Sequence, residues 1–233
     1  MSSVRAAMHA GLRAVIQNSL GADLDLPGGL VYSAGTTVKP GKVYIMGLNP
    51  GGNPEVDKFS IQQSLDKLPT EPGNDYADSW ANRPAGQAPL QRRIRYLVED
   101  VLGAQLEETF ATNLIFRKTR SARDLNLSVE GDRCWPVHEA FLKIVRPDFI
   151  LVFGNSGISP YGYLLGRSRA AGCVLDEETS QPSGHGSWRL RTFSAVLGGR
   201  PTRIVGFPHL SRYDPTRKPH VAAWLQRLTV SRG

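Results

Sequence analysis

The spacing of apolar residues predicts that helices and strands alternate along the chain. Residues Val4–Leu20 place apolar side chains near the helical period and are followed by Gly21, a common helix stop. Residues Lys42–Gly47 (KVYIMG) form a short β-branched run between Pro40-Gly41 and a cluster of Gly, Pro and Asn. These patterns predict a leading amphipathic helix and a first core strand.

The same alternation continues toward the C-terminus. Three further apolar runs predict strands at Phe110–Phe116, Phe149–Gly154 and Thr202–Phe207. Helical spacing recurs at Leu90–Leu102, Cys134–Val145, Gly162–Ala171 and His220–Leu228, and Gln181–Trp188 has the composition of a turn-rich connection. Strands separated by helices imply parallel crossovers, so we expect an α/β fold with three layers, α/β/α, around a mostly parallel four-stranded sheet.

The segment from Gly51 to Pro89 differs in composition from the rest, since it is rich in Gly, Pro, Asn, Asp and Gln. Only Phe59–Leu68 has the pattern of a short helix. A loop of this length either covers a site or is a mobile surface insertion. We expect one domain over residues 1–233, with this loop inserted at about 51–89.

Composition narrows the class of protein only in part. Lys and Arg number 28 against 21 Asp and Glu, a net charge of +7, which favours a polyanionic partner but equally suits an enzyme with a solvated basic surface. Cys134 and Cys173 are too few and too distant for a zinc knuckle, an iron–sulfur cluster or a disulfide framework. The N-terminus lacks the apolar core of a signal peptide. We therefore expect a cytoplasmic, monomeric protein without a membrane partner.

Polar residues stand where each predicted strand ends. They are Asn49, Asn113, Asn155 with Ser156, and His209 with Ser211. Each has an alternative as a turn residue or helix cap. Because parallel sheets bind ligands beyond the carboxyl ends of their strands, we expect these residues to converge on one crevice.

Two of these segments resemble motifs of the uracil-DNA glycosylase superfamily. Gly47–Gly51 (GLNPG) is similar to the first motif in the Gly-x-Asn-Pro-Gly form of the mismatch-specific and single-strand-selective branches. Pro208–Arg212 (PHLSR) resembles the second motif, His-Pro-Ser, although Leu210 stands where that motif has Pro. With Asn113, which resembles the base-reading asparagine of the family, the similarity extends from roughly Val43 to Tyr213. The resemblance implies a uracil-DNA glycosylase-like fold and excision of a flipped base from DNA, without metal or organic cofactor.

The resemblance also implies roles in catalysis and base binding. Asn49 would position a water molecule, since an amide cannot take up its proton, and His209 would donate to the departing base. Asn113 and the Leu48 backbone amide would read the base, and Phe59, with Tyr76 behind it, would stack on it. Each role has an alternative. His209 would be a structural histidine, Asn113 a buried amide that connects a strand to a loop, and Phe59 the anchor of a short helix.

The predicted DNA contacts follow the second and last strands. They comprise Arg117, Lys118, Arg120, Arg123, Ser211, Arg212 and Tyr213. Arg212 or Tyr213 would enter the gap left by the base, and the basic run Arg117–Arg123 would contact phosphates. The alternative is that both segments are solvated surface loops that do not contact DNA. Two other functions stay open, a non-catalytic nucleic-acid-binding protein and a nucleotide or nucleoside hydrolase.

Overall fold

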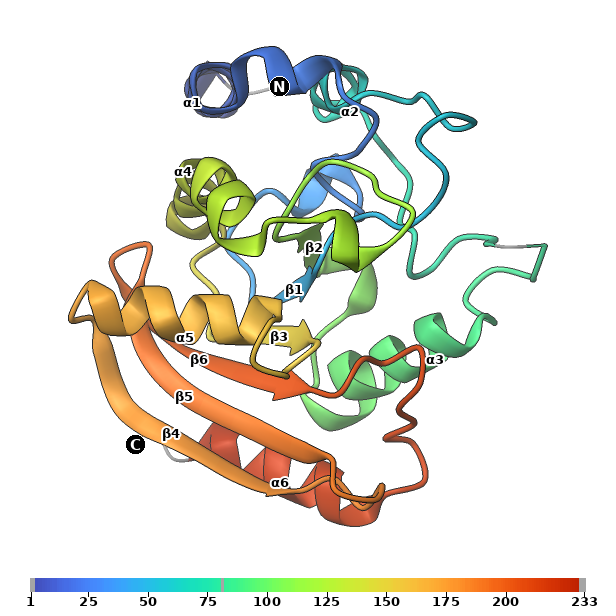
Figure 1. The fold of residues 1–233 in the computed structure, drawn as a ribbon, viewed down its shortest axis with the longest axis vertical. Helices are drawn as coiled ribbons and strands as arrows, with labels where there is room; N and C mark the ends of the chain where they lie inside the picture. Colours follow the sequence, from blue (N-terminus) through green and yellow to red (C-terminus); the bar gives the residue numbers. More distant parts are fainter. Residues whose placement is uncertain (1–2, 81, 231–233) are drawn as a thin grey trace.

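The computed structural model describes residues 3–80 and 82–230, and its centre is a mixed sheet of six strands (Figure 1). The strands are β1 (Val43–Gly47), β2 (Phe110–Asn113), β3 (Phe149–Phe153), β4 (Val174–Pro182), β5 (Arg189–Leu197) and β6 (Arg200–Phe207). Their order is β2-β1-β3-β6-β5-β4, and the first four pair in parallel. These four are the strands expected from the sequence, so the α/β class is confirmed.

The expected number of strands is wrong, because β4 and β5 add an antiparallel pair at one edge. β4 has the sequence VLDEETSQP, and none of its residues is fully buried. A charged, solvent-facing edge strand lacks the apolar run that identifies a core strand, which is why the sequence pattern did not reveal it. The predicted turn at Gln181–Trp188 falls at the connection between the two strands, where Gly184 and Gly186 adopt positive φ angles of 72° and 52°.

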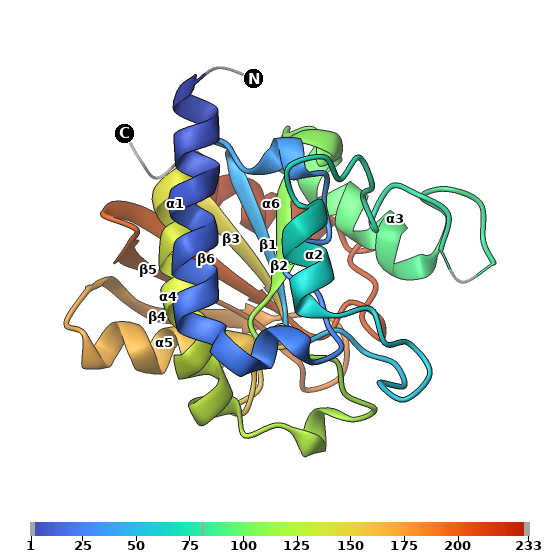
Figure 2. The ribbon, with the colours of Figure 1, turned by 90° about the horizontal axis from the view of Figure 1, so that it is seen from above.

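Helices cover both faces of the sheet (Figures 1 and 2). One side carries α1 (Ser3–Leu20), α2 (Ile61–Lys67), α4 (Leu127–Val145) and α5 (Pro160–Ala170). The other carries α3 (Pro89–Arg95), which continues as a π-helical turn over Tyr96–Val101, and α6 (Pro219–Val230). All six helices overlap segments with predicted helical spacing, but α4 begins at Leu127, seven residues before the expected start at Cys134.

The alternation of β1 shows how the strand joins the two sides. Tyr44 and Met46 pack in the core beneath α1, α4 and α5, whereas Val43 and Ile45 pack in the core beneath α3 and α6. Successive side chains of a strand point to opposite faces, so both faces of this strand are buried. This arrangement accounts for its continuous apolar sequence and fixes the direction in which its carboxyl end points.

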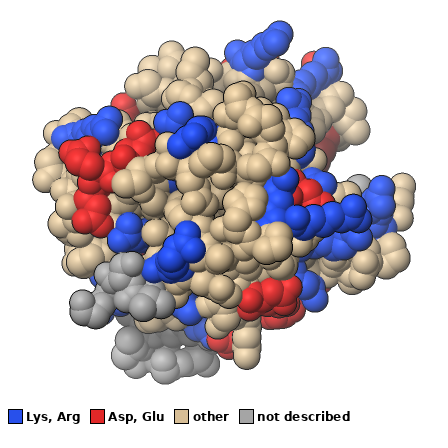
Figure 3. Space-filling view, turned by 90° about the horizontal axis from the view of Figure 1, so that it is seen from below, with Lys and Arg blue, Asp and Glu red and all other residues tan. Residues whose placement is uncertain are grey.

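Within the described residues, no helix has both the length and the apolar character needed to cross a membrane. On the face shown in Figure 3, basic side chains alternate with acidic and neutral surface, and the largest basic group lies at the right-hand side. Apart from that group, the basic side chains of this face are thus mixed with acidic ones.

Candidate active site

The parallel strands point their carboxyl ends toward a cavity of about 840 Å³. Residues from the carboxyl ends of all four parallel strands contribute to its wall, together with parts of the 51–89 loop. The residues expected from the sequence that line it are Leu48, Asn49, Phe59, Tyr76, Asn113, Lys118, His209 and Ser211. The expected polar residues thus converge from the ends of β1, β2 and β6, whereas β3 contributes Phe153.

The glycine-rich turn after β1 is held against the segment that follows β2. Backbone hydrogen bonds run from the amides of Leu114, Ile115 and Thr119 to the carbonyls of Gly47, Leu48 and Pro50, at 2.9, 2.9 and 3.2 Å. Two segments that are about 65 residues apart in sequence are thereby paired beyond the strands themselves. The pairing places Asn49 and Asn113 on the same wall.

The Asn49 side chain is half-buried and has a defined orientation. Its Nδ2 donates to Thr119 Oγ1 at 2.8 Å, to the Pro50 carbonyl at 3.0 Å and to the Arg117 carbonyl at 3.5 Å. Among the described residues, none donates a hydrogen bond to its Oδ1. Since an amide has one acceptor oxygen and one donor nitrogen, this arrangement leaves the oxygen free to accept a hydrogen bond from a water molecule.

Asn113 lies deeper, with 8% of its surface exposed. Its Oδ1 lies directly against Gly47, so that a side chain at position 47 would overlap it. Near it lies Tyr32, a cavity residue that the sequence did not single out, whose hydroxyl donates to the Gly29 carbonyl at 3.4 Å. Burial raises the pKa of Tyr32 far above its ordinary value, and the Asn113 side chain opposes this shift. The tyrosine therefore stays neutral and able to donate.

The His209 ring is fixed by the turn that follows it. Its Nδ1 accepts a hydrogen bond from the Ser211 amide at 3.2 Å and lies 2.7 Å from Ser211 Oγ. Phe153 contacts the ring edge-on, with 5.9 Å between ring centroids. Although the residue is exposed, partial desolvation of the ring first, and the charge of Arg212 second, lower the pKa of His209. A neutral ring whose Nδ1 accepts a hydrogen bond carries its proton on Nε2, so His209 can act as a neutral N–H donor.

The 51–89 loop contributes a carboxylate that the sequence did not identify. The Asp75 amide donates to the Tyr32 carbonyl at 3.0 Å, and Gln91 Nε2 donates to the Asp75 carbonyl at 2.7 Å. Although the residue is exposed to solvent, partial desolvation of its carboxylate first, and the charges of Asp78 and Glu71 next, raise the pKa of Asp75 to about 6.

Phe59 and Tyr76 line the same cavity, as the sequence suggested. Phe59 comes directly before Ser60, which caps α2, and Lys67 Nζ lies 4.9 Å from the centroid of its ring. Tyr76 is buried, with 7% of its surface exposed. Phe59 is therefore both an anchor for α2 and an aromatic wall of the cavity, so its two expected roles are compatible.

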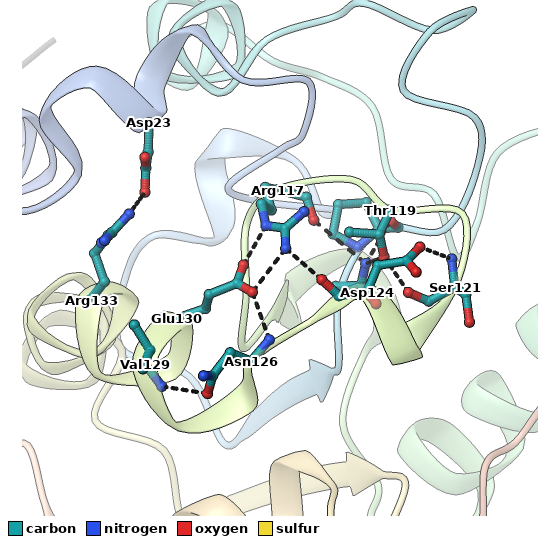
Figure 4. A network of polar contacts seen from close by, with 11 residues as sticks. Asp23, Arg117, Thr119, Ser121, Asp124, Asn126, Val129, Glu130 and Arg133 are labelled. Carbon is teal, nitrogen blue, oxygen red and sulfur yellow. Dashed lines mark hydrogen bonds and ion pairs between the residues drawn. The ribbon is translucent and has the colours of Figure 1, made fainter.

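The basic run after β2 is not a free phosphate-binding strip. Arg117 forms an ion pair with Glu130 and donates to the Asp124 carbonyl at 2.8 Å, and Glu130 also accepts from the Asn126 amide at 2.9 Å (Figure 4). These contacts connect the run to the start of α4. Arg117 therefore has a structural role in this structure, and its expected phosphate contact would require it to leave Glu130.

Two further cations of the run pair with the loop after β1. Lys118 forms an ion pair with Asp57, and Arg120 pairs with Glu55 and donates to Asn53 Oδ1 at 3.0 Å. Arg123 is exposed and has no ion pair within residues 3–80 and 82–230. Phosphates would have to displace acidic side chains to reach Lys118 or Arg120.

The prediction that Tyr213 enters the DNA is wrong in this structure. Its side chain is fully buried, and its hydroxyl donates to the Ser183 carbonyl at 2.7 Å. Arg212 is exposed beside His209 and remains the candidate for that position. Asn155 does not reach the cavity either, because its amide donates to the carbonyls of Gly206 and Arg189 at 2.8 and 2.7 Å.

Several cavity residues were not predicted from the sequence. They include Tyr32, Asp57, Glu71, Asp75, Trp80, Gln91 and Phe153. Phe153 alone carried a usable signal, since it is the last side chain of an expected strand. In the part of the chain that the structure describes, no three His, Cys, Asp or Glu side chains are grouped in a way that would hold a metal ion.

A scan against models of known protein families finds no match, and a search of curated proteins finds no significant match. The resemblance to the glycosylase motifs therefore depends on the residues described above.

Proposed function

We propose that the chain is a DNA glycosylase of the uracil-DNA glycosylase superfamily that hydrolyses the N-glycosidic bond of uracil or a related deaminated base in DNA. The observation that carries the proposal is the convergence of Asn49, Asn113 and His209 on one cavity from the ends of β1, β2 and β6. These residues are distant in the sequence, and each has the type that the resemblance assigns to its position.

The geometry supports a hydrolysis in which the site stabilises the departing base. Asn49 Oδ1 accepts a hydrogen bond from a water molecule, whose oxygen forms a bond to C1′ of the sugar. The C1′–N bond breaks, its electron pair goes to the base, and the proton of the water is lost to solvent. The His209 Nε2–H donates to the negative charge that develops on the base, which is where a fixed donor lowers the barrier most.

Asn113 selects the base in this proposal. Its amide offers a donor and an acceptor, the pattern that complements the N–H and carbonyl edge of uracil. A base without that edge leaves a buried amide unpaired, which costs binding free energy. Phe59 supplies the aromatic face on which an extruded base stacks.

The test is single-turnover base release from end-labelled oligonucleotides that contain uracil, hypoxanthine or a G·T mismatch. Single and double strands are compared, and alkali then reveals abasic sites. We expect His209→Ala to slow release about 10²- to 10³-fold, as loss of one donor to a developing negative charge does in other enzymes. Asn49→Ala should slow release while DNA binding is retained. His220→Ala is the matched control, because His220 is exposed and lies outside the cavity lining.

Other outcomes would identify the alternatives. Absence of product from every oligonucleotide, together with tight, salt-sensitive DNA binding, would indicate a non-catalytic binding protein. Hydrolysis of free nucleosides with little dependence on salt would indicate a small-molecule hydrolase, for which the cavity volume leaves room.

A further inference from the structure

The cavity is acidic although the protein as a whole is basic. Among the residues that the structure describes, the acidic residues Asp57, Glu71 and Asp75 line it, and Lys118 is the one Lys or Arg that does so. Lys118 pairs with Asp57, so the charges of the other two acidic side chains are not compensated within the lining. Such a wall repels phosphate and favours a ligand group that is cationic or rich in hydrogen-bond donors.

Asp75 is the cavity carboxylate that is most available to a ligand. Asp57 is occupied by Lys118, and Glu71 Oε1 accepts from the Gly73 amide at 2.9 Å. Within residues 3–80 and 82–230, the Asp75 carboxylate accepts no hydrogen bond and forms no ion pair, although its backbone is held on both sides. A carboxylate on a fixed backbone, exposed toward the cavity residues and without a partner, is free to pair with a ligand that neutralises it.

The remaining wall suits a large, flat cation. Aromatic side chains line the cavity at Tyr32, Phe59, Tyr76, Trp80 and Phe153. Aromatic faces attract cations, and the attraction grows where water is excluded. The volume of about 840 Å³ lies in the upper part of the range of small-molecule sites, so it accommodates a two-ring base as well as a pyrimidine.

We propose that the cavity also accepts a positively charged, N-alkylated purine base, with Asp75 as its counter-charge. This proposal rests on the proposed glycosylase function and extends it to a second class of substrate.

The chemistry of such a base fits Asn49. When the C1′–N9 bond of an alkylated purine breaks, the electron pair enters the ring and cancels its positive charge, so the base leaves as a neutral molecule. A water oxygen forms the new bond to C1′ and the proton goes to solvent. Since the leaving group is already activated, a strong proton acceptor is not needed, and an amide that only orients water suffices.

Asp75 would act on binding more than on the chemical step. The negative charge of Asp75 stabilises the positively charged base in the bound state. The base has lost its positive charge when the C1′–N9 bond is broken. The groups that face Asp75 are Glu71, Asp78, Lys118, Tyr32 and Tyr76. Because the raised pKa of about 6 makes Asp75 neutral in mild acid, capture of a cationic base should weaken as the pH falls through 6.

The experiment compares three duplex oligonucleotides that carry 7-methylguanine, hypoxanthine or uracil at one position. Single-turnover release is measured over a range of protein concentrations at pH 7.5, with wild type, Asp75→Asn and Asp100→Asn. Asp100 is the matched control, because it is exposed, lies outside the cavity lining and is not among the charges that act on Asp75. Thermal melting checks that each variant is folded.

We expect Asp75→Asn to raise the half-saturating concentration for 7-methylguanine by roughly 10- to 100-fold, the usual cost of removing a hydrogen bond to a charged group. Its maximal rate, and both parameters for hypoxanthine and uracil, should change little. Release of uracil or hypoxanthine without release of 7-methylguanine, or an equal effect of Asp75→Asn on all three, would overturn this inference and leave the proposed function standing. Failure to release any base would overturn both.

Discussion

The substitution Gly47→Ala tests the packing on which the candidate site depends. A Cβ at position 47 would overlap Asn113 Oδ1 and lie 3.0 Å from Phe153 Cε2. Overpacking of a tight core lowers the free energy of unfolding by about 1–3 kcal/mol. Replacing glycine by alanine also lowers the conformational entropy of the unfolded chain, which stabilises the folded state by about 0.4–1 kcal/mol. We therefore expect the free energy of unfolding to fall by roughly 1–2 kcal/mol, with base release reduced further because Asn113 must move.

Urea denaturation and single-turnover release are measured together for this variant and for two comparisons. Gly51→Ala is the matched control in the same turn, because a Cβ there meets no atom within 4 Å, and its stability should be close to that of wild type. In an Asn113→Ala background the overlap is relieved, so adding Gly47→Ala should cost less stability than in wild type. If Gly47→Ala is as stable and active as Gly51→Ala, the Asn113 side chain does not pack against Gly47 and its assigned place in the cavity wall is wrong.

Three further outcomes follow from the contacts. Burial lowers the pKa of His138 to about 4, so protonation of this residue favours the unfolded chain. The free energy of unfolding should be highest above pH 6.5 and should fall by up to about 3 kcal/mol toward pH 4. Urea denaturation over this pH range measures the change, and no dependence on pH would contradict the prediction. Arg117→Ala should lower the free energy of unfolding by about 1–3 kcal/mol, because it leaves Glu130 without its cation, and should not alter the salt dependence of DNA binding. Replacing Glu55 by Gln and Asp57 by Asn frees Arg120 and Lys118, which should strengthen DNA binding in anisotropy titrations. The slope of the affinity against salt concentration should become steeper by the equivalent of up to roughly two phosphate contacts. Unchanged binding would mean that Arg120 and Lys118 do not contact DNA.

The parts of the fold that could be predicted are those whose sequence pattern reports burial directly. β1 and β3 are buried on both faces, so their residues are continuously apolar and identify themselves. β5 buries most of its residues, but its sequence, RLRTFSAVL, mixes polar and apolar positions, and its partner β4 is largely exposed. Its burial depends on α4 and α5 packing over it, which local spacing does not encode.

The candidate site divides in the same way. Asn49, Asn113 and His209 could be located because each follows or ends a strand, and strand ends of a parallel sheet meet at one edge. Asp75 could not be located, because its place in the wall is set by contacts with Tyr32 and Gln91 that join the 51–89 loop to distant segments. Tyr213 was misjudged since its sequence position does not reveal that its ring turns into the core.

Net charge proves a poor guide to where this chain would meet a polyanion. The chain carries +7, yet three of the four cations in the run after β2 are paired with carboxylates, and the cavity beside them is acidic. Glu55 and Asp57 are exposed, at 77% and 54% of their side-chain surface, and pairs with such carboxylates contribute little to stability, so the loop that carries them would yield to a phosphate at small cost. In the proposed function, a bound duplex would leave its phosphates on Lys118 and Arg120, and the acidic residues of the cavity would admit an uncharged or cationic base and repel the backbone. The proposed function would thus use the opposed charges of the loop and the cavity to separate the two parts of a nucleotide.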